Sequence, residues 1–276
     1  MNTAGHSWLP RATCHAGCVR MAEDAAVQPF RTALRVAFRV TCALLVAPGI
    51  PLLGVPLPGS TGVQRTYCRL VLRCFGVRIK VSGNPIRNLR GVLVVSSHTS
   101  WLDAFAIGAV LPGSFVARAD MCAAGPVGML ARILRVIPIE RSSLRRLPDV
   151  VDAVARRLRA GQTVVAFPEG TTWCGLASGS FYPAMFQAAI DSGRPVQPLR
   201  LSYHHADGSV STAPAYVGDD TLGRSVSRLL RVRRTVVSLR VESLQLPGPD
   251  RRELAGRCQS VVFRERARGH RHALVA

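Results

Sequence analysis

The chain has 276 residues, of which 48% are hydrophobic, and this composition supplies the core of one domain with an appendage and excludes a disordered chain. Its 36 basic and 16 acidic residues give a formal net charge of +20, and Lys80 is the sole lysine, so arginine carries the excess charge. A charge of this size indicates an anionic partner, either a nucleic acid or a membrane of acidic lipids.

Residues 1–27 lack the apolar core of a secretory signal, and we expect them to form a flexible tail. Cys14, His15 and Cys18 lie within this stretch, but the sequence has no second paired cluster beside them, which favours a stray polar extension over a zinc site. The eight cysteines are scattered, mostly in apolar segments, and indicate a reducing compartment. We therefore expect neither a metal site nor a cofactor.

Residues 28–60 are expected to anchor the chain to a membrane. The stretch RTALRVAFRVTCALLV places Arg31, Arg35 and Arg39 on one helical stripe, which is typical of a helix that lies at the interface with its arginines among phosphate headgroups. Residues 40–57 are uncharged and long enough to approach a bilayer span, but prolines and glycines interrupt them. An interfacial or re-entrant anchor is favoured over a single span, and a core helix followed by an apolar loop is the alternative.

Residues 61–270 are expected to form an α/β domain with a central mixed, largely parallel sheet flanked by helices. Short apolar runs of the kind that is buried on both faces alternate with helical patterns. Strands are expected at 77–81, 92–96, 114–117, 136–139, 163–167, 196–202 and 235–241, and helices at 62–75, 101–110, 126–134, 147–160, 183–191 and 250–267. No zinc-finger spacing, basic zipper or aromatic RNA-binding signature is present, so nucleic-acid binding is not expected.

The first motif with chemical content is Ser97-His98-Thr99-Ser100-Trp101-Leu102-Asp103, where an apolar strand delivers His98 to a strand-to-helix turn. An imidazole there can take a proton from an alcohol while Asp103 holds its other nitrogen. The spacing alone is common. The alternative is a helix start that Thr99 or Ser100 caps, with Asp103 in the first turn.

The second motif is Phe167-Pro168-Glu169-Gly170-Thr171, which also follows an apolar strand. Pro168 fixes one backbone angle and Gly170 permits a positive one, so the motif predicts a tight turn. Backbone N–H groups in such a turn can bind an anion.

In order and spacing, these motifs resemble the conserved blocks of the glycerolipid acyltransferase family, whose members transfer a fatty acyl chain from a thioester to a hydroxyl of glycerol 3-phosphate, lysophosphatidic acid or a related lipid. The resemblance covers about residues 65–205. His98 and Asp103 match the first block and residues 167–171 match the third without exception. The second block is similar to Val136-Ile137-Pro138-Ile139-Glu140-Arg141-Ser142, and the fourth to Arg194-Pro195-Val196-Gln197-Pro198-Leu199.

The resemblance implies that His98 is the general base and that Asp103 fixes its tautomer, with acyl-CoA or acyl carrier protein as the acyl donor. It also implies that the second block binds the phosphate of the acceptor, and Arg141 suits this role because a guanidinium matches phosphate oxygens in a bidentate manner. Arg118 is a weaker candidate for the same contact.

The third block, with Glu169, Gly170 and Thr171, is associated by the same resemblance with acceptor binding and with the architecture of the site. Glu169 repels phosphate, so we expect it to act through hydrogen bonds to an arginine, to a backbone turn or to the glycerol hydroxyl. The alternative is that Glu169 is a loop lock that holds the site together.

The chain departs from the family pattern after Thr171, where many relatives carry basic residues and this chain has Thr172-Trp173-Cys174-Gly175. The departure leaves the identity of the acceptor open between 1-acylglycerol 3-phosphate, which leads, and another lyso-lipid such as lyso-ornithine lipid. A non-catalytic lipid-binding module is the alternative of another class. Anionic membrane lipids, the acyl donor and the lyso-lipid are the expected partners, and the cytoplasmic face of the cell membrane is the expected location.

Overall fold

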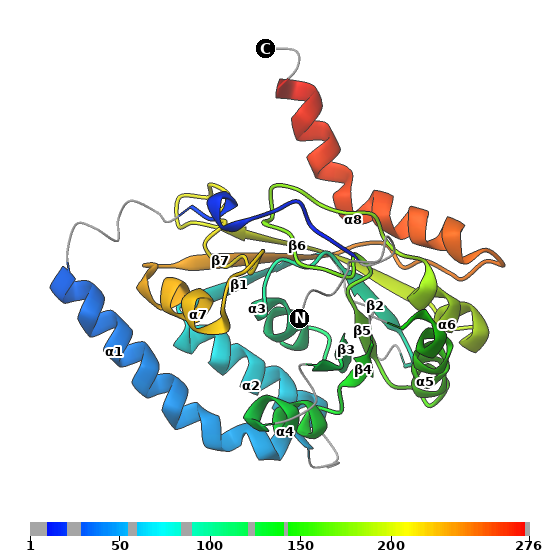
Figure 1. Ribbon diagram of the computed structural model, residues 1–276, viewed down its shortest axis with the longest axis horizontal. Coiled ribbons are helices and arrows are strands. Elements are labelled where there is room, and N and C mark those ends of the chain that lie inside the picture. Colours follow the sequence, from blue (N-terminus) through cyan, green and yellow to red (C-terminus); the bar gives the residue numbers. More distant parts are fainter. Residues whose placement is uncertain are drawn as a thin grey trace.

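The computed structural model describes residues 10–20, 29–54, 60–83, 90–120, 125–140 and 143–273. Its centre is a seven-stranded sheet in the order β1-β7-β6-β2-β5-β3-β4 (Figure 1). The neighbouring strands are parallel except β6 and β7, which pair antiparallel. The strands are β1 Val77–Ser82, β2 Leu93–Ser96, β3 Ser114–Arg118, β4 Ile137–Ile139, β5 Val164–Ala166, β6 Val196–His204 and β7 Thr235–Val241.

Helices cover both faces of this sheet, which confirms the mixed, largely parallel α/β arrangement predicted from the apolar runs. Leu93 and Val95 of β2 belong to one apolar core, and Val94 belongs to the other, because successive side chains of a strand point to opposite faces. One core is formed with α5 Leu147–Arg159, α6 Ala184–Ser192 and α8 Arg251–Ala273, and the other with α2 Ser60–Cys74, α3 Leu102–Gly108 and α7 Leu222–Arg231.

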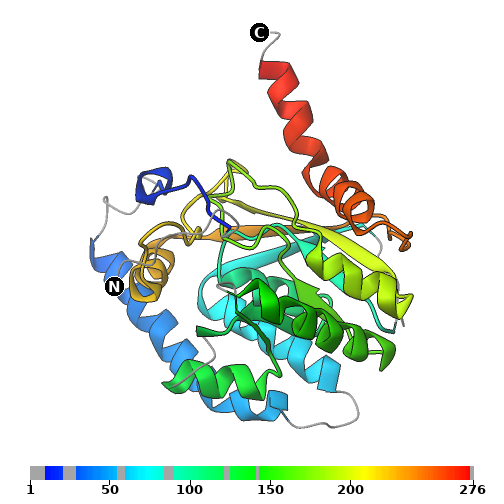
Figure 2. The same ribbon diagram turned by 45° about the vertical axis from the view of Figure 1, so that its right-hand side comes forward.

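The remaining helical elements lie at the margins of the sheet. They are η1 Ala16–Cys18, α1 Pro29–Val46, η3 Ala47–Gly54, α4 Gly125–Ile133 and η5 Leu144–Arg146. The C-terminal half of α8 extends away from the body of the molecule in two views (Figures 1 and 2). Helices α1, η3 and α2 contact one another. The residues expected to anchor the chain therefore lie beside the apolar core that α2, α3 and α7 form with the sheet.

Helix α7 has no counterpart among the expected helices. Its sequence, LGRSVSRLLR, contains three arginines together with Gly223 and two serines, and glycine and serine are weaker helix formers than alanine or leucine. Thr221 caps its first turn by accepting a hydrogen bond from the Arg224 N–H at 3.3 Å, and Leu229 and Leu230 bury its apolar face. Tertiary packing therefore overrides the weak local propensity.

Part of the stretch expected to be a flexible tail is packed against the domain. Residues 10–20 form the short turn η1 and bury Cys14, and the Arg20 N–H donates to Thr212 Oγ1 at 2.8 Å. The contact depends on residues more than 150 positions away in the chain, so no local pattern predicts it. Residues 1–9 and 21–28 lie outside the described residues.

Arg35 and Arg39 of the arginine stripe on α1 face the protein, which corrects the expectation that they lie among phosphate headgroups, while Arg31 is exposed. Arg39 is buried and donates hydrogen bonds to the carbonyls of Leu230, Val232 and Arg233 at 2.7–2.9 Å, while Arg35 donates to the Arg231 carbonyl at 2.9 Å. These carbonyls belong to the last turn of α7 and to the residues after it, where the helix leaves acceptors unpaired. A guanidinium can satisfy several of them at once, so α1 is fastened to α7 by its arginines.

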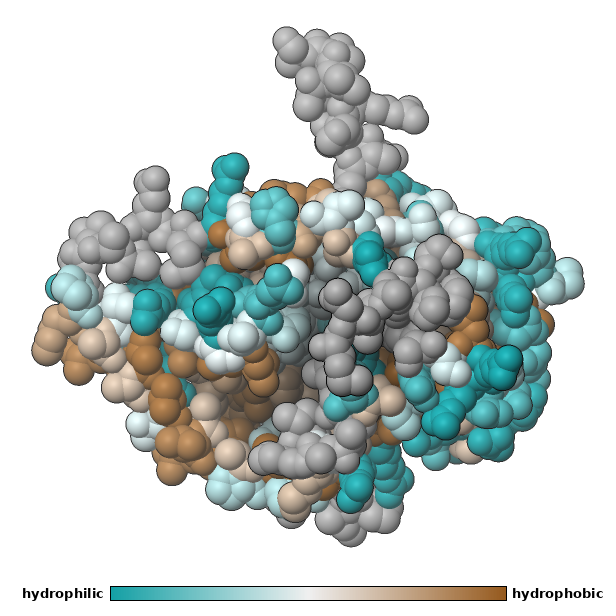
Figure 3. All heavy atoms as spheres, viewed as in Figure 1, coloured by the Kyte–Doolittle hydropathy of each residue, from teal (hydrophilic) through white to brown (hydrophobic). Residues whose placement is uncertain are grey.

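The outward face of α1 is consequently apolar. Pro29–Pro51 is long and apolar enough to cross a membrane, and only 6% of its most apolar window is buried in the protein. Apolar residues gather over the side where α1 and α2 lie (Figure 3). The most exposed large apolar residues of α1 are Phe30, Leu34, Phe38, Leu44 and Leu45.

Candidate active site

The two sequence motifs meet at one edge of the sheet. β2 and β5 are parallel neighbours with Val95 opposite Ala166, so His98 and Phe167 emerge next to each other at their carboxyl ends. β6 is parallel to β2 on its other side and delivers Tyr203 to the same edge. Crevices at the carboxyl ends of parallel strands are the usual position of ligand sites in α/β folds.

His98 and Asp103 are in direct contact, as the sequence motif predicts. The His98 Nδ1 atom lies 2.8 Å from Asp103 Oδ2, and Asp103 is fully buried in the first turn of α3. The His98 side chain is 20% exposed, and its Nε2 atom has no hydrogen-bond partner among the described residues. A ring nitrogen is thus left open to a substrate while the other is held.

Asp103 is surrounded by donors alone. Its Oδ2 atom also accepts hydrogen bonds from the N–H groups of Thr99 and Ser100 at 2.7 and 2.9 Å, and its Oδ1 atom accepts one from the Tyr203 hydroxyl at 2.6 Å. Each of these contacts needs an acceptor on Asp103, and an ionised carboxylate supplies it. The ionised form can only accept, so Nδ1 of His98 carries the proton and Nε2 is the free base.

Tyr203 was not singled out from the sequence. Burial raises its pKa well above the usual value, and the charge of Asp103 and the hydrogen bond to it raise that pKa further, so the hydroxyl stays protonated and donating. The expected strand ended at residue 202, whereas β6 continues to His204. If the expected strand is extended by one residue, Tyr203 falls at its carboxyl end, beside the strand that leads to His98. This position is the signal in the sequence that could have identified Tyr203.

Glu169 holds the backbone of the site together. It is 2% exposed, its Oε2 atom accepts a hydrogen bond from the His98 N–H at 2.8 Å, and its Oε1 atom accepts one from the Gly179 N–H at 2.8 Å. The His98 carbonyl accepts from the Trp173 N–H at 2.8 Å. His98 is therefore fixed on both sides of its backbone by the turn at residues 167–171 and the loop after it.

Gly170 occupies a position that other residues fit poorly. Its φ is +67°, in the left-handed region, and a Cβ atom there would lie 2.6 Å from Pro10 Cγ. The next residue, Thr171, is half-buried beside it. The N-terminal segment thus covers the turn that the sequence predicted, and only glycine allows both the turn and the close approach of Pro10.

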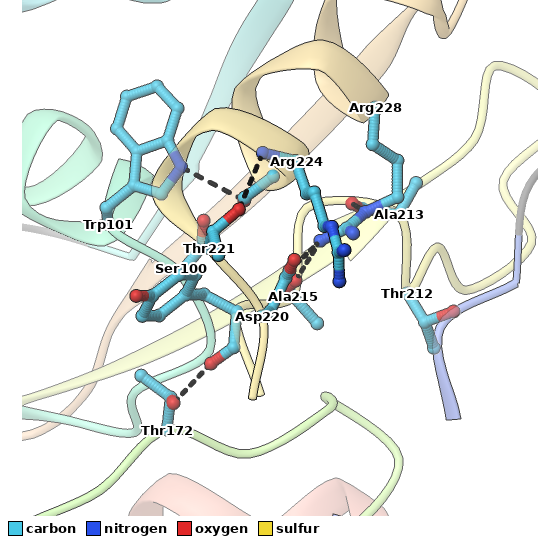
Figure 4. A network of polar contacts seen from close by, with 12 residues as sticks. Ser100, Trp101, Thr172, Thr212, Ala213, Ala215, Asp220, Thr221, Arg224 and Arg228 are labelled. Atoms are coloured by element: carbon cyan, nitrogen blue, oxygen red, sulfur yellow. Dashed lines mark hydrogen bonds and ion pairs between the residues drawn. The ribbon is translucent and has the colours of Figure 1, made fainter. Parts of the chain in front are cut away.

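A third segment, the loop at residues 211–221, lies beside Ser100 and Thr172, which belong to the segments that carry the two motifs (Figure 4). The Tyr216 N–H donates to the Thr99 carbonyl at 2.9 Å, and the Thr172 hydroxyl donates to the Tyr216 carbonyl. Arg228 of α7 holds the loop from the other side. Its guanidinium donates to the carbonyls of Ala213 and Ala215 at 2.7 and 2.5 Å and pairs with Asp220 at 2.7 Å.

Of the two arginines expected to bind phosphate, the structure describes Arg118 and does not describe Arg141. Arg118 ends β3, next to β5, where it is exposed and paired with Asp120, whose hydrogen bond and charge raise the pKa of the guanidinium. Arg141 lies outside the described residues. Its neighbour Glu140 pairs within the fold, with its Oε2 atom 2.9 Å from Arg146 Nη1.

An apolar cavity of about 250 Å³ adjoins this edge. It lies between α1, η3, α2 and α3, and Phe115 forms part of its wall. Phe115 stacks on Phe167 with 6.5 Å between ring centroids, and Phe167 stacks on His98 with 4.0 Å. The rings of Phe115 and Phe167 therefore form a series of contacts from the cavity wall to the imidazole.

Comparisons with known proteins agree with this arrangement. A profile of the acyltransferase family matches residues 78–202. A 1-acyl-sn-glycerol-3-phosphate acyltransferase from Neisseria meningitidis is 35% identical over 54% of this chain and 58% of its own length. A lyso-ornithine lipid O-acyltransferase from Pseudomonas aeruginosa is 34% identical over 67% of this chain and 70% of its own length.

The fold is also similar to a solved structure. The crystal structure of the 1-acyl-sn-glycerophosphate acyltransferase PlsC from Thermotoga maritima superposes with a TM-score of 0.61 and 18% identity, and covers 86% of this chain and 95% of that chain. At this identity the likeness concerns the fold. The sequence match to the Neisseria meningitidis relative spans less than two thirds of that relative's length.

Proposed function

Because this chain belongs to the acyltransferase family, of the lysophospholipid type, we propose that it moves a fatty acyl group from acyl-CoA or acyl carrier protein to the free hydroxyl of a lysophospholipid. The leading acceptor is 1-acyl-sn-glycerol 3-phosphate, and the product is then phosphatidic acid. The single observation that carries the proposal is the contact of His98 Nδ1 with the buried Asp103 at 2.8 Å, which leaves Nε2 as a free base.

In this proposal His98 acts on the acceptor hydroxyl. Nε2 takes the hydroxyl proton as the oxygen attacks the thioester carbonyl, and the new C–O bond forms while the C–S bond breaks. The imidazolium then returns the proton to the departing thiolate. Asp103 stabilises the imidazolium that exists between these two transfers, and no covalent acyl-enzyme is required.

The apolar cavity beside the site is the proposed location of an acyl chain. Its wall includes residues of η3 and of α1, and α1 is the helix whose apolar side is exposed. A chain that enters from a lipid layer reaches Phe115 and Phe167 before it reaches His98. We therefore propose that α1 lies at the cytoplasmic face of the membrane, as an interfacial or single-span anchor, with the site turned toward the lipid.

Two arginines are proposed to bind the phosphate of the acceptor. Arg118 is at the carboxyl end of β3. Its ion pair with Asp120 weakens its attraction for an anion. Arg141 follows the carboxyl end of β4, which pairs with β3. Arg141 is thus proposed as the main phosphate contact, with Arg118 as a secondary one.

A second acceptor has support of its own. Relatives named lyso-ornithine lipid O-acyltransferase match up to 77% of this chain, and the loop after Thr172 lacks the basic residues common in the family. A less anionic acceptor suits a loop without that charge. Lyso-ornithine lipid is therefore the second candidate acceptor for the same reaction.

Product analysis separates these candidates. The full chain in lipid vesicles is given equal amounts of 1-acylglycerol 3-phosphate and lyso-ornithine lipid, once with acyl-CoA and once with acyl carrier protein, and products are identified by mass spectrometry. Phosphatidic acid as the main product supports the leading proposal, and acylated ornithine lipid supports the second. Absence of any acylated product contradicts both and favours a non-catalytic lipid-binding module.

A further inference from the structure

Three cysteine sulfurs meet where the N-terminal segment crosses the loop after the Pro-Glu-Gly-Thr turn. The Sγ atoms of Cys14, Cys18 and Cys174 all lie within 4.8 Å of one another. Cys14 and Cys174 are 160 residues apart in the chain. The sequence does not predict this cluster, because Cys14 and Cys18 have no second cysteine pair near them and only the fold brings Cys174 beside them.

Two of the three sulfurs lie among backbone N–H groups. Cys14 and Cys174 are 7% and 3% exposed, and Cys18 is half-buried. The Cys174 N–H lies 3.4 Å from the Cys14 sulfur, and the N–H groups of Leu176 and Ala177 donate to the sulfur of Cys174. Backbone donors of this kind stabilise ligand atoms that carry negative charge in metal sites.

We propose that Cys14, Cys18 and Cys174 bind one Zn²⁺ ion as thiolates, with solvent in the fourth position. Thiolates are ligands that Zn²⁺ prefers, with Zn–S distances of about 2.3 Å, which place tetrahedral sulfurs about 3.8 Å apart. The three sulfurs reach this separation by closing through about 1 Å or less. Cys18 is the most accessible of the three and marks the side from which the ion enters.

The ion would fasten the N-terminal segment to the loop that supports the imidazole. Cys174 follows Trp173, whose N–H donates to the His98 carbonyl, and the same loop continues to Gly179, whose N–H donates to Glu169. Cys14 also belongs to the segment whose Pro10 covers Gly170. The ion thus has a structural role, with its ligand Cys174 next to the residue that contacts the backbone of the proposed base, and takes no part in acyl transfer.

Metal content tests the proposal independently of activity. The full chain is purified under reducing conditions from cells grown with zinc, and its zinc is measured by plasma mass spectrometry beside Cys174→Ser and the matched control Cys42→Ser, which alters a half-buried cysteine of α1. The wild type and C42S should each hold one equivalent, and C174S should lose it. Cobalt exchanged into the wild type should give thiolate-to-cobalt absorption that C174S lacks.

A second measurement covers the case in which C174S folds poorly. Chelation of the zinc from the wild type should lower the thermal unfolding midpoint by several degrees, and zinc should restore it. The proposal is overturned if the wild type holds no zinc and gives no cobalt spectrum, or if a folded C174S keeps its metal. None of these outcomes bears on the proposed acyl transfer.

Discussion

Glu169 accepts a hydrogen bond from the backbone N–H of His98 at 2.8 Å, so the carboxylate of one motif holds the main chain of the other. Its second oxygen accepts from Gly179 on the loop beyond. A buried carboxylate with two backbone donors supports the backbone around the site, which fits both the expected hydrogen bonds to a backbone turn and the loop-lock alternative. Any direct contact of Glu169 with the acceptor remains a prediction.

Glu169→Gln should therefore lower stability and turnover together. The glutamine amide N–H₂ faces one of the two backbone donors in place of an oxygen, and an unsatisfied buried donor costs about 1–3 kcal/mol. We expect kcat to fall and KM for the acceptor to change little. Chemical unfolding and steady-state kinetics measure both quantities, with Glu253→Gln, in an exposed pair with Arg257 on α8, as the control that leaves both unchanged.

Tyr203→Phe should reduce kcat by about tenfold at unchanged KM, because it removes a hydrogen bond to a charged group, which contributes about 1.5–3 kcal/mol, and loosens Asp103. Tyr203 touches Asp103 and not the substrate, so it is a positioning residue. Equal kcat values in the variant and the wild type would show that Tyr203 does not position Asp103 for catalysis.

The pH dependence of stability gives Tyr203→Phe a second readout. The folded-state pKa of Tyr203 is raised above its unfolded value, so its stabilising contribution is complete below about pH 10 and is lost as the pH rises through the folded-state pKa. The difference in unfolding free energy between wild type and Y203F should be constant from neutral pH to about pH 9 and shrink above about pH 10. A difference that is flat through the alkaline range contradicts this.

Gly170→Ala should be more damaging than Gly193→Ala. Both glycines have positive φ, at +67° and +61°, so both variants carry similar backbone strain of about 1 kcal/mol or more. A Cβ at Gly170 also meets Pro10, whereas a Cβ at Gly193 meets nothing within 4 Å. The excess loss of stability in G170A, measured by chemical unfolding, reports the contact of the N-terminal segment with the turn.

Arg39→Met should detach α1 from α7 while it keeps an apolar stem of similar length. The variant leaves several carbonyls after α7 unpaired, and we expect a loss of about 2 kcal/mol or more of stability and faster proteolysis within residues 29–46. Arg31→Met, which alters an exposed arginine of the same helix, is the matched control. Equal proteolysis of the two variants would show that Arg39 does not fasten the helix.

The sequence predicts best what is local and follows a buried strand. His98, Asp103 and the turn at residues 167–171 lie in contiguous motifs, and each is found at the carboxyl end of an apolar strand as predicted. The sheet was predictable for the same reason, since its strands are short apolar runs with helices between them. In these places local propensity and the fold agree.

Features that depend on long-range contacts could not be predicted in this way. Tyr203 and Arg228 reach the site from elements more than 100 residues from His98, and one charged residue of α7 among many arginines carries no local signal. The arginines of α1 show the limit most clearly, because headgroup phosphates and helix carbonyls both satisfy a guanidinium. Only the packing of α7 shows that Arg39 faces protein.

The central claim is that His98 is the general base for acyl transfer, and the initial rate of His98→Ala in lipid vesicles tests it most directly. Loss of a positioned general base should reduce the rate by about 10²–10⁴-fold. Flotation with the vesicles should match the wild type, because α1 and its contacts with α7 are untouched. A rate for H98A within a few-fold of the wild type, with the protein folded and vesicle-bound, would contradict the account.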